Sequence, residues 1–484
     1  MKNFLKKGIL PIGAYCPPMI PVAGYNGHES FITEEQYKLV KEAGIDIIYA
    51  HSEVMNTSTE KYAFLSLELA EKTGLIVYVR DEIAKEYVSL GDQGYKPFSD
   101  LTANEKRDLD NRFIESIKRY YEYKSFGGIS FWDEPGYNSF EGIARAKKVF
   151  DSVCPDKTFY VNMYPYYISP KQYQFGYWNK GFSNKPTNPH FDIIEGKRNI
   201  ERYEFLYDEY IRIVKPDFFS YDAYPFSSFG YVTTSVHEVL WELPQFLHGK
   251  EIENGVPFWV YLQAGGKWEG HLNVRVPSFA EISLGVGVPL LYGAKGLQVF
   301  PYCYPNDWLN DNVAEAGFID RKGEKTRIYY DYVKVLKHVK MMQDYLIKSK
   351  LKGIIKSGEY KNGLPSNKEL SKIQWHECIY NGKLSPKYNI EINSYKHIRK
   401  IKSDIECLTG CIEINSKYGY FILNNSTIHN AHYNISFTEK GKYLIIKDGN
   451  KYEVVTDVIE LTLEAGEFFL IVGESNLGVY NEKY

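Results

Sequence analysis

Short apolar runs alternate with stretches of helical periodicity through roughly the first 340 residues of the chain. Runs that are apolar on both faces suit the strands of a parallel sheet, because helices cover each side of such a sheet. Strands that alternate with helices in this way predict repeated βα units. The predicted strands are Ile9–Tyr15, Ile45–Ala50, Leu75–Arg80, Gly128–Trp132, Thr158–Met163, Phe218–Tyr221, Pro257–Leu262 and Gly296–Tyr302.

Eight such units predict an α/β fold, the (β/α)8 TIM barrel. The first predicted helix, Thr33–Glu42, opens with a Thr-x-Glu-Glu capping signal. The longest predicted loop, Tyr166–Gly196, is rich in Tyr, Asn, Pro and Gly, and loops of that length are usually lids or binding walls. The other predicted helices are Tyr62–Thr73, Asn104–Tyr123, Phe140–Ser152 and Asn199–Val214.

After about Lys350 the pattern changes to short segments of alternating polarity, separated by turn dipeptides such as Asp448-Gly449. This pattern predicts a C-terminal antiparallel β-sandwich. We therefore expect a barrel over residues 1–345 and a sandwich with its connector over 346–484. We expect the sandwich to pack against the barrel, and a sugar-binding role for it stays open. Its predicted strands include Tyr418–Asn424, His432–Phe437, Tyr443–Lys447, Val458–Leu463 and Phe468–Val472.

Composition and charge limit the partners and cofactors that can be expected. A net charge of −3 gives no reason to expect nucleic acid or an anionic membrane as a partner, and no apolar run of 18 residues is present. The six cysteines form no CxxC pair and the histidines form no ligand cluster, so no metal or cofactor is predicted. The 43 tyrosines reflect either a compositional bias or sugar-stacking surfaces. The N-terminus lacks a signal peptide, which favours a cytoplasmic protein, although a trimmed secreted form would look the same.

The most informative segment is Gly127–Gly136, in which a buried strand runs directly into Asp133 and Glu134 before Pro135 ends it. Carboxylates at the C-terminal end of a barrel strand lie where β/α barrels keep their chemistry. A buried acid is costly unless it is paired or neutralised. The segment therefore predicts that Glu134 is a catalytic acid.

Polar groups follow the other predicted strands as well, and a closed barrel would bring them to one pocket. Carboxylates, amides and tyrosines at these positions suit a neutral, polyhydroxylated ligand. The strand ends lack the glycine-rich loop that phosphate binding needs and a lysine placed for a Schiff base. The predicted binding residues are Asp81, Trp132, Asn162, Tyr164, Tyr221, Gln263, Tyr302 and Trp308, with Tyr304, Asn306 and Asp307 beside the last strand.

Each acidic candidate also has a structural interpretation. Asp133 is expected to point away from Glu134 unless a bulge intervenes, and could pair with Arg80. Asp222 could close its strand through an Asx turn, and Asp81 could cap a loop or helix. Glu281 follows a Pro-Ser signal for a helix cap, so a capping role is expected for it. His51 is one of eleven scattered histidines, and we expect it to be a surface or core histidine.

Four motifs in this order resemble the barrel of clan A-type glycoside hydrolases, above all bacterial β-galactosidase-like barrels. They are Asp133-Glu134-Pro135, Tyr160-Val161-Asn162, the segment from Lys215 to Pro225, and Tyr292–Phe300. The similarity covers roughly residues 8–340. It implies that Glu134 is the acid/base and that a glutamate nucleophile ends the seventh strand. That strand instead ends at Gln263, and the next acid is Glu269.

Three mechanisms therefore stay open. Asp222 could be the second carboxylate, as nucleophile or as base for water. Asp133 and Glu134 could act on a 2-acetamido sugar whose own carbonyl oxygen replaces the protein nucleophile. Alternatively, the barrel could bind a glycan without cleaving it, or use Glu269 after a loop rearrangement. We predict a glycosidase acting on an oligosaccharide or glycan, with Glu134 as proton donor beside Asp133, and a non-catalytic glycan-binding barrel as the alternative.

Overall fold

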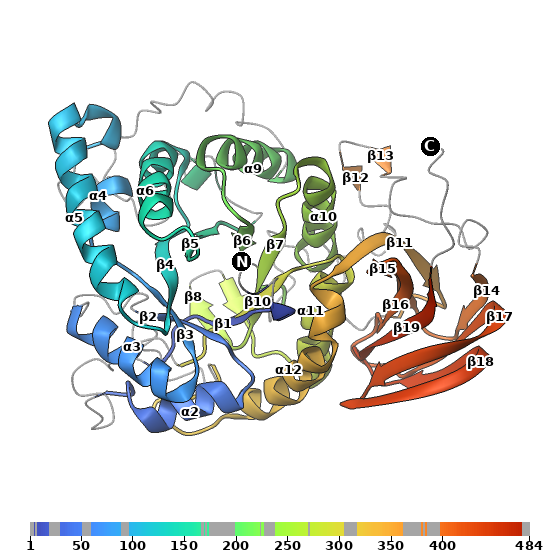
Figure 1. The fold of residues 1–484 in the computed structure, drawn as a ribbon. Coiled ribbons are helices and arrows are strands. Elements are labelled where there is room, and N and C mark those ends of the chain that lie inside the picture. The colour runs from blue at the N-terminus through green and yellow to red at the C-terminus, as the bar shows by residue number, and fades with distance from the viewer. Residues whose placement is uncertain are drawn as a thin grey trace.

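The structure of the protein is a computed structural model, and it confirms the predicted fold class. Eight parallel strands close into a barrel in the order β1-β10-β7-β6-β5-β4-β3-β2, with helices around the outside (Figure 1). The residues that the structure describes are 4, 7–18, 30–50, 60–88, 96–165, 169, 172–173, 199–222, 224–226, 238–269, 272–303, 317–361, 379–380, 383–384 and 397–476.

All eight barrel strands fall inside or close to the segments predicted from the apolar runs. Their central residues are almost entirely buried, as expected for strands covered by helices on one side and by the barrel interior on the other. The strands are β1 (Ile12–Ala14), β2 (Ile47–Ala50), β3 (Ile76–Val79), β4 (Phe126–Asp133), β5 (Thr158–Met163), β6 (Phe219–Tyr221), β7 (Phe258–Gln263) and β10 (Gly296–Phe300).

The helices around the barrel begin where the sequence places its caps. Thr33 caps the first of them by accepting a hydrogen bond from the Gln36 amide at 3.3 Å, and Thr102 forms a capping box with Glu105. None of the described helices is long and apolar enough to cross a membrane. The α-helices are α2 (Glu34–Glu42), α3 (Glu60–Thr73), α4 (Ala84–Val88), α5 (Ala103–Tyr121), α6 (Phe140–Val153), α9 (Asn199–Val214), α10 (Leu243–Asn254), α11 (Phe279–Leu291) and α12 (Arg327–Leu346).

The C-terminal strands form one antiparallel sheet, in which β17 joins two predicted segments into one long strand. The register of β17 shifts between Ser436 and Gly441, where the polar segment interrupts the alternation. Asp448 and Gly449 both have positive φ in the turn that follows. The strands are β11 (Ser349–Ser357), β14 (Ile398–Ser403), β15 (Cys407–Ile414), β16 (Lys417–Asn424), β17 (Ala431–Lys447), β18 (Asn450–Leu463) and β19 (Phe468–Asn476).

One face of this sheet packs on α11 and shares the apolar core of the barrel, whereas the other face encloses a second core. At α11, Gly287 lies against Leu423 and Phe468, and Ser283 Oγ donates to the Gly466 carbonyl at 2.8 Å. The sheet thus stands beside α11 and α12 (Figure 1). The short pairs β8 (Lys267–Glu269) with β9 (Leu272–Val274) and β12 (Ile379–Tyr380) with β13 (Lys383–Leu384) complete the described strands.

Candidate active site

The C-terminal end of β4 presents Asp133 and Glu134 at the mouth of the barrel. The register of β4 against β5 shifts between Ser130 and Trp132, after which Asp133 lies opposite Asn162. Glu134 then adopts a left-handed backbone with φ of 49°, while its amide donates to the Asn162 carbonyl at 2.9 Å. A non-glycine residue with positive φ is uncommon and clusters at functional sites. Because Glu134 leaves the extended conformation, the simple alternation expected for these two acids does not apply.

The Asp133 carboxylate is held from two sides inside the barrel mouth. Tyr15 OH donates to Oδ2 at 3.2 Å, and Asn162 Nδ2 donates to Oδ1 at 3.0 Å. Both donors are neutral, so they stabilise the ionised carboxylate without neutralising its charge. The expected partner Arg80 has its guanidinium 5.0 Å from the centre of the Trp132 ring.

Asn162 links this carboxylate to a hydrogen-bond network that crosses the barrel interior. Its Oδ1 accepts from Ser220 Oγ at 3.0 Å, and Ser220 Oγ in turn accepts from Gln298 Nε2 at 2.9 Å. Tyr160 OH lies 3.1 Å from the same serine and donates to Tyr261 OH at 3.0 Å. Burial raises the pKa of both tyrosines well above its ordinary value, so they remain neutral. The network fixes the orientation of Asn162 before any ligand arrives.

Asp222 follows β6 and is buried, with 8% of its surface exposed. Burial raises the pKa of its carboxyl to about 7, although hydrogen bonds with Asn162, Glu134 and Tyr224 each lower it in part. Its Oδ1 atom is enclosed without a hydrogen-bond partner. Asp222 and Glu134 are therefore neighbouring carboxyl groups that interact with each other. The sequence interpretation expects a raised pKa at Glu134, which stays a prediction; the raised pKa that the structure gives in this pair is that of Asp222.

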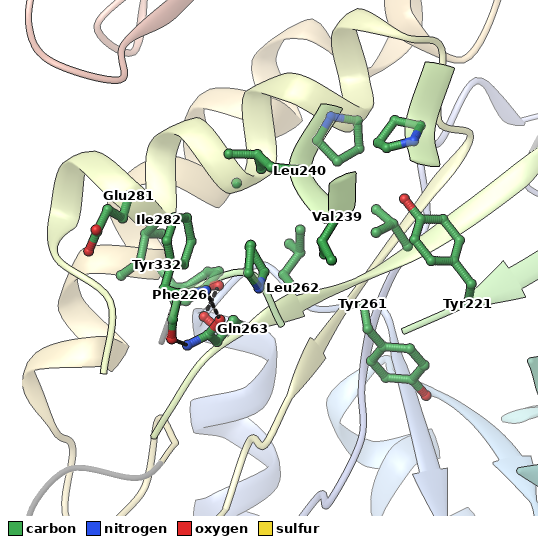
Figure 2. A pocket seen from close by; sticks show the side chains of 15 residues that line it. Tyr221, Phe226, Val239, Leu240, Tyr261, Leu262, Gln263, Glu281, Ile282 and Tyr332 are labelled. Atoms are coloured by element: carbon green, nitrogen blue, oxygen red, sulfur yellow. Dashed lines mark hydrogen bonds between the residues drawn. The ribbon is translucent and has the colours of Figure 1, made fainter. Parts of the chain in front are cut away.

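Gln263, at the end of β7, is tied to the main chain rather than directed to a ligand (Figure 2). Its Oε1 accepts from the Phe226 amide at 2.9 Å, and its Nε2 donates to the Phe226 carbonyl at 3.0 Å and to the Arg275 carbonyl at 2.6 Å. Since this accounts for both ends of the amide, Gln263 fixes the loop after β6 against the segment after β9. The arrangement weighs against the sugar contact predicted for it.

Asp81 and Glu281 have the structural roles that the sequence offered for them. Asp81 Oδ1 accepts from the Ile83 amide at 2.9 Å, and its Oδ2 accepts from Ser116 Oγ, so its carboxylate joins the loop after β3 to α5. Glu281 closes a capping box with Ser278 and forms two hydrogen bonds with Arg275. Figure 2 shows Glu281 away from Tyr261, the ring that belongs to the barrel network.

The predicted aromatic contacts are nearly all buried. Tyr302 is fully enclosed and stacks on Phe318 with ring centres 5.1 Å apart, so neither face is open to a sugar ring. Trp132 and Tyr164 are 5% and 1% exposed, and Tyr221 faces the small cavity beside β7 shown in Figure 2. Other predicted positions lie outside the described residues, namely His51, Tyr304, Asn306, Asp307, Trp308 and most of the loop 166–196, and the side chain of Glu269 is not described.

Sequence reasoning did not find Tyr15 or Ser220. Tyr15 follows β1 and Ser220 lies in the middle of β6, and a single tyrosine or serine in an apolar run gives no distinguishing signal. Only the barrel closure, which pairs β1 with β10 and β2, brings Tyr15 across to Asp133. Within the described ranges, no group of three His, Cys, Asp or Glu side chains is arranged to hold a metal ion.

Neither the comparison with protein-family models nor that with curated proteins finds a match. Among solved structures the chain is similar to a family 39 glycoside hydrolase from Bacteroides cellulosilyticus WH2, with 11% identity, a TM-score of 0.47, and coverage of 96% of this chain and 81% of that one. It is also similar to a β-galactosidase from Bacillus circulans sp. alkalophilus, with 10% identity, a TM-score of 0.47, and coverage of 96% and 99%.

A catalytic mutant of a GH42 β-galactosidase from G. stearothermophilus shares 8% identity over 96% of this chain and 98% of that one, with a TM-score of 0.48. At such identities the likeness concerns the fold alone. The closed parallel barrel is the fold that the resemblance to clan A-type glycoside hydrolases implied. What the site does must follow from its own residues.

Proposed function

We propose that the protein is a glycoside hydrolase whose catalytic groups are the carboxyls of Glu134 and Asp222. The observation that carries the proposal is that the two carboxyls interact at the C-terminal mouth of the barrel, where burial raises the pKa of Asp222 to about 7. Glycoside hydrolysis needs a pair of carboxyl groups of which one holds a proton near neutral pH and the other is ionised. This pair meets that requirement.

In this mechanism the pair retains one proton up to about neutral pH, and that proton protonates the glycosidic oxygen. The ionised partner acts as nucleophile or activates water. Asp133, which receives hydrogen bonds from Tyr15 and Asn162, supplies a fixed negative charge beside the oxocarbenium-like transition state. Asn162 joins the three carboxyl groups into one arrangement.

The separation between the Glu134 and Asp222 carboxyls bears on the stereochemistry of the proposed reaction. Retaining enzymes separate their carboxyls by about 5 Å and inverting enzymes by about 6.5–9.5 Å. The separation reached in the complex decides whether the anomeric configuration is retained or inverted.

The test is a panel of aryl-glycosides and natural oligosaccharides assayed with the wild type, Glu134→Gln and Asp222→Asn. Each variant should lose about 10²–10⁴-fold in kcat on any substrate that the wild type hydrolyses. Glu82→Gln is the matched control, because Glu82 is a half-exposed carboxylate after β3 that pairs with Lys85. Hydrolysis that continues unchanged in Glu134→Gln would refute its assignment, and an unimpaired Asp222→Asn would exclude that carboxyl as nucleophile, base or acid.

A second candidate function is glycan binding without cleavage. The observation that favours it is Gln263, which stands where the resemblance implies a carboxylate and whose amide is occupied by main-chain groups. Saturable binding of an oligosaccharide by a wild type that turns over no member of the panel would decide for this candidate. Measurable hydrolysis of any member would decide against it.

A further inference from the structure

A hollow on the C-terminal sheet lies apart from the barrel mouth. It has a volume of about 600 Å³ and is lined by residues at or next to β14, β17 and β18. Small-molecule sites in proteins typically measure about 300–1,000 Å³, so the hollow is large enough for a ligand. Register shifts in β14 and β17 bend the strands that form it.

The alternation of the three strands decides which side chains face the hollow. Ile401, Ile435 and Ile459 point inward and belong to the second apolar core. Their neighbours along the strands therefore point outward. In the pairing register Lys402 lies opposite Asn434, which lies opposite Glu460, and His432 lies opposite Thr462 in the next row. The outward face thus carries two rows of polar side chains across three strands.

These side chains are ordered by contacts with one another. Asn434 Nδ2 donates to Glu460 Oε1, and the Thr462 hydroxyl lies 3.3 Å from His432 Nδ1. At the end of the hollow, Asp404 Oδ1 accepts from the His432 amide at 2.7 Å. Cross-strand pairs of this kind hold rotamers before a ligand binds, which lowers the entropic cost of binding.

The groups that remain are both donors and acceptors. Asn434 keeps its carbonyl oxygen and a second N–H, Glu460 keeps a second oxygen, and His432 keeps Nε2. Two carboxylates, from Asp404 and Glu460, face a single lysine, Lys402, so the hollow does not favour a phosphate or another polyanion. Closely spaced amide, carboxylate and imidazole groups instead match a ligand that presents many hydroxyls.

We propose that this hollow is a second binding site, specific for a neutral oligosaccharide and separate from the barrel. The inference does not depend on catalysis in the barrel, because it rests on the lining of the C-terminal sheet alone. A shallow, largely polar site on one sheet face gives weak affinity, with a Kd on the order of 1 mM. Its use would be to hold the protein on a glycan that offers many copies of the same unit.

The experiment is titration calorimetry of the full-length chain in the Glu134→Gln background, which removes turnover. The probes are short neutral oligosaccharides of glucose, galactose, xylose and mannose. At least one should bind, and the double variant His432→Ala/Asn434→Ala should weaken that binding at least about tenfold. Glu460→Gln should weaken the binding less than the double variant does, and this substitution disturbs the sheet less. The matched control is Glu453→Gln, an exposed glutamate of β18 outside the hollow, which should bind as its parent does.

Binding that Glu460→Gln and the double variant both leave unchanged would overturn the proposal, because the ligand would then occupy the barrel or another surface. A panel with no binding member would also overturn it. If the wild type hydrolyses none of the substrates, in contrast, that result would bear only on the catalytic proposal and would leave the binding results unaffected. Melting temperatures of all variants distinguish local loss of binding from unfolding of the sheet.

Discussion

Replacing Asp222 by Asn should stabilise the protein at alkaline pH while it removes the carboxyl that we propose to be catalytic. Burial raises the pKa of this carboxyl from 3.8 to about 7, so the folded protein ionises Asp222 only at a cost. One pKa unit corresponds to 1.36 kcal/mol, and the raised pKa therefore lowers the free energy of unfolding of the wild type by about 4 kcal/mol at pH 8. Asn keeps the size of the side chain, can donate to Glu134, and carries no charge at any pH.

The sign follows from the proton count. Between pH 3.8 and about 7 the folded protein holds a proton on Asp222 that the unfolded chain has released, so the wild type loses stability as pH rises through this window. The asparagine variant has no such loss. The free energy of unfolding of the variant minus that of the wild type should thus grow from a baseline near pH 4 by about 4 kcal/mol at pH 8.

Thermal unfolding of both proteins across pH 4 to 8 measures this difference, which should appear as a shift of several degrees. Asp100→Asn serves as the control, because Asp100 is an exposed carboxylate outside the network. An Asp222→Asn advantage that does not grow between pH 5 and pH 8 would refute the reasoning. So would a wild type that is the more stable protein at pH 8, since Asp222 would then be stabilised as an anion.

Three further substitutions test the surrounding structure. Gln263→Glu should not create a nucleophile, because its carboxylate would face the Phe226 and Arg275 carbonyls. Hydrolysis by this variant should not exceed that of the wild type, and its melting temperature should fall further at pH 8 than at pH 5. Gly466→Ala should loosen the C-terminal sheet from α11, because Gly466 has φ of 71° and a Cβ would overlap the Ala280 carbonyl; faster limited proteolysis would show this. Lys295→Met should cost about 1–3 kcal/mol for each of the two carbonyls that lose their donor, Leu346 at the end of α12 and Ser349 at the start of β11, measured by thermal unfolding.

The barrel could be predicted because its strands carry their signal locally. Each is a short apolar run followed by a polar residue, and this pattern can be recognised without knowing which strands pair with it. The C-terminal sheet was predicted less accurately, since the segments His432–Phe437 and Tyr443–Lys447 belong to one strand, β17. The polar residues between them break the alternation, but the pairing with β18 continues beyond them after a shift of register. Long-range pairing of this kind leaves no local trace.

The strand ends placed Asp133, Asn162 and Asp222 in one region, and the structure brings them together with Glu134. The distribution of protons among them could not be predicted, because it depends on burial and on partners from other strands. Tyr15 and Asn162 stabilise Asp133 as an anion, while burial of Asp222 opposes its ionisation. Neither effect is visible in the order of residues along the chain.

In the proposed mechanism, the arrangement of the three carboxyls would couple proton donation to substrate entry. Three ionised carboxylates in one network would repel one another strongly; two neutral donors stabilise Asp133, whereas at Asp222 burial outweighs the hydrogen bonds that lower its pKa. In that mechanism Glu134 and Asp222 would hold one proton between them. A glycosidic oxygen that enters between them would replace that shared hydrogen bond and receive the proton in the same step. A ligand too small or too shallow to reach the buried Asp222 would not receive the proton, so productive binding in this mechanism would require a sugar that reaches that residue.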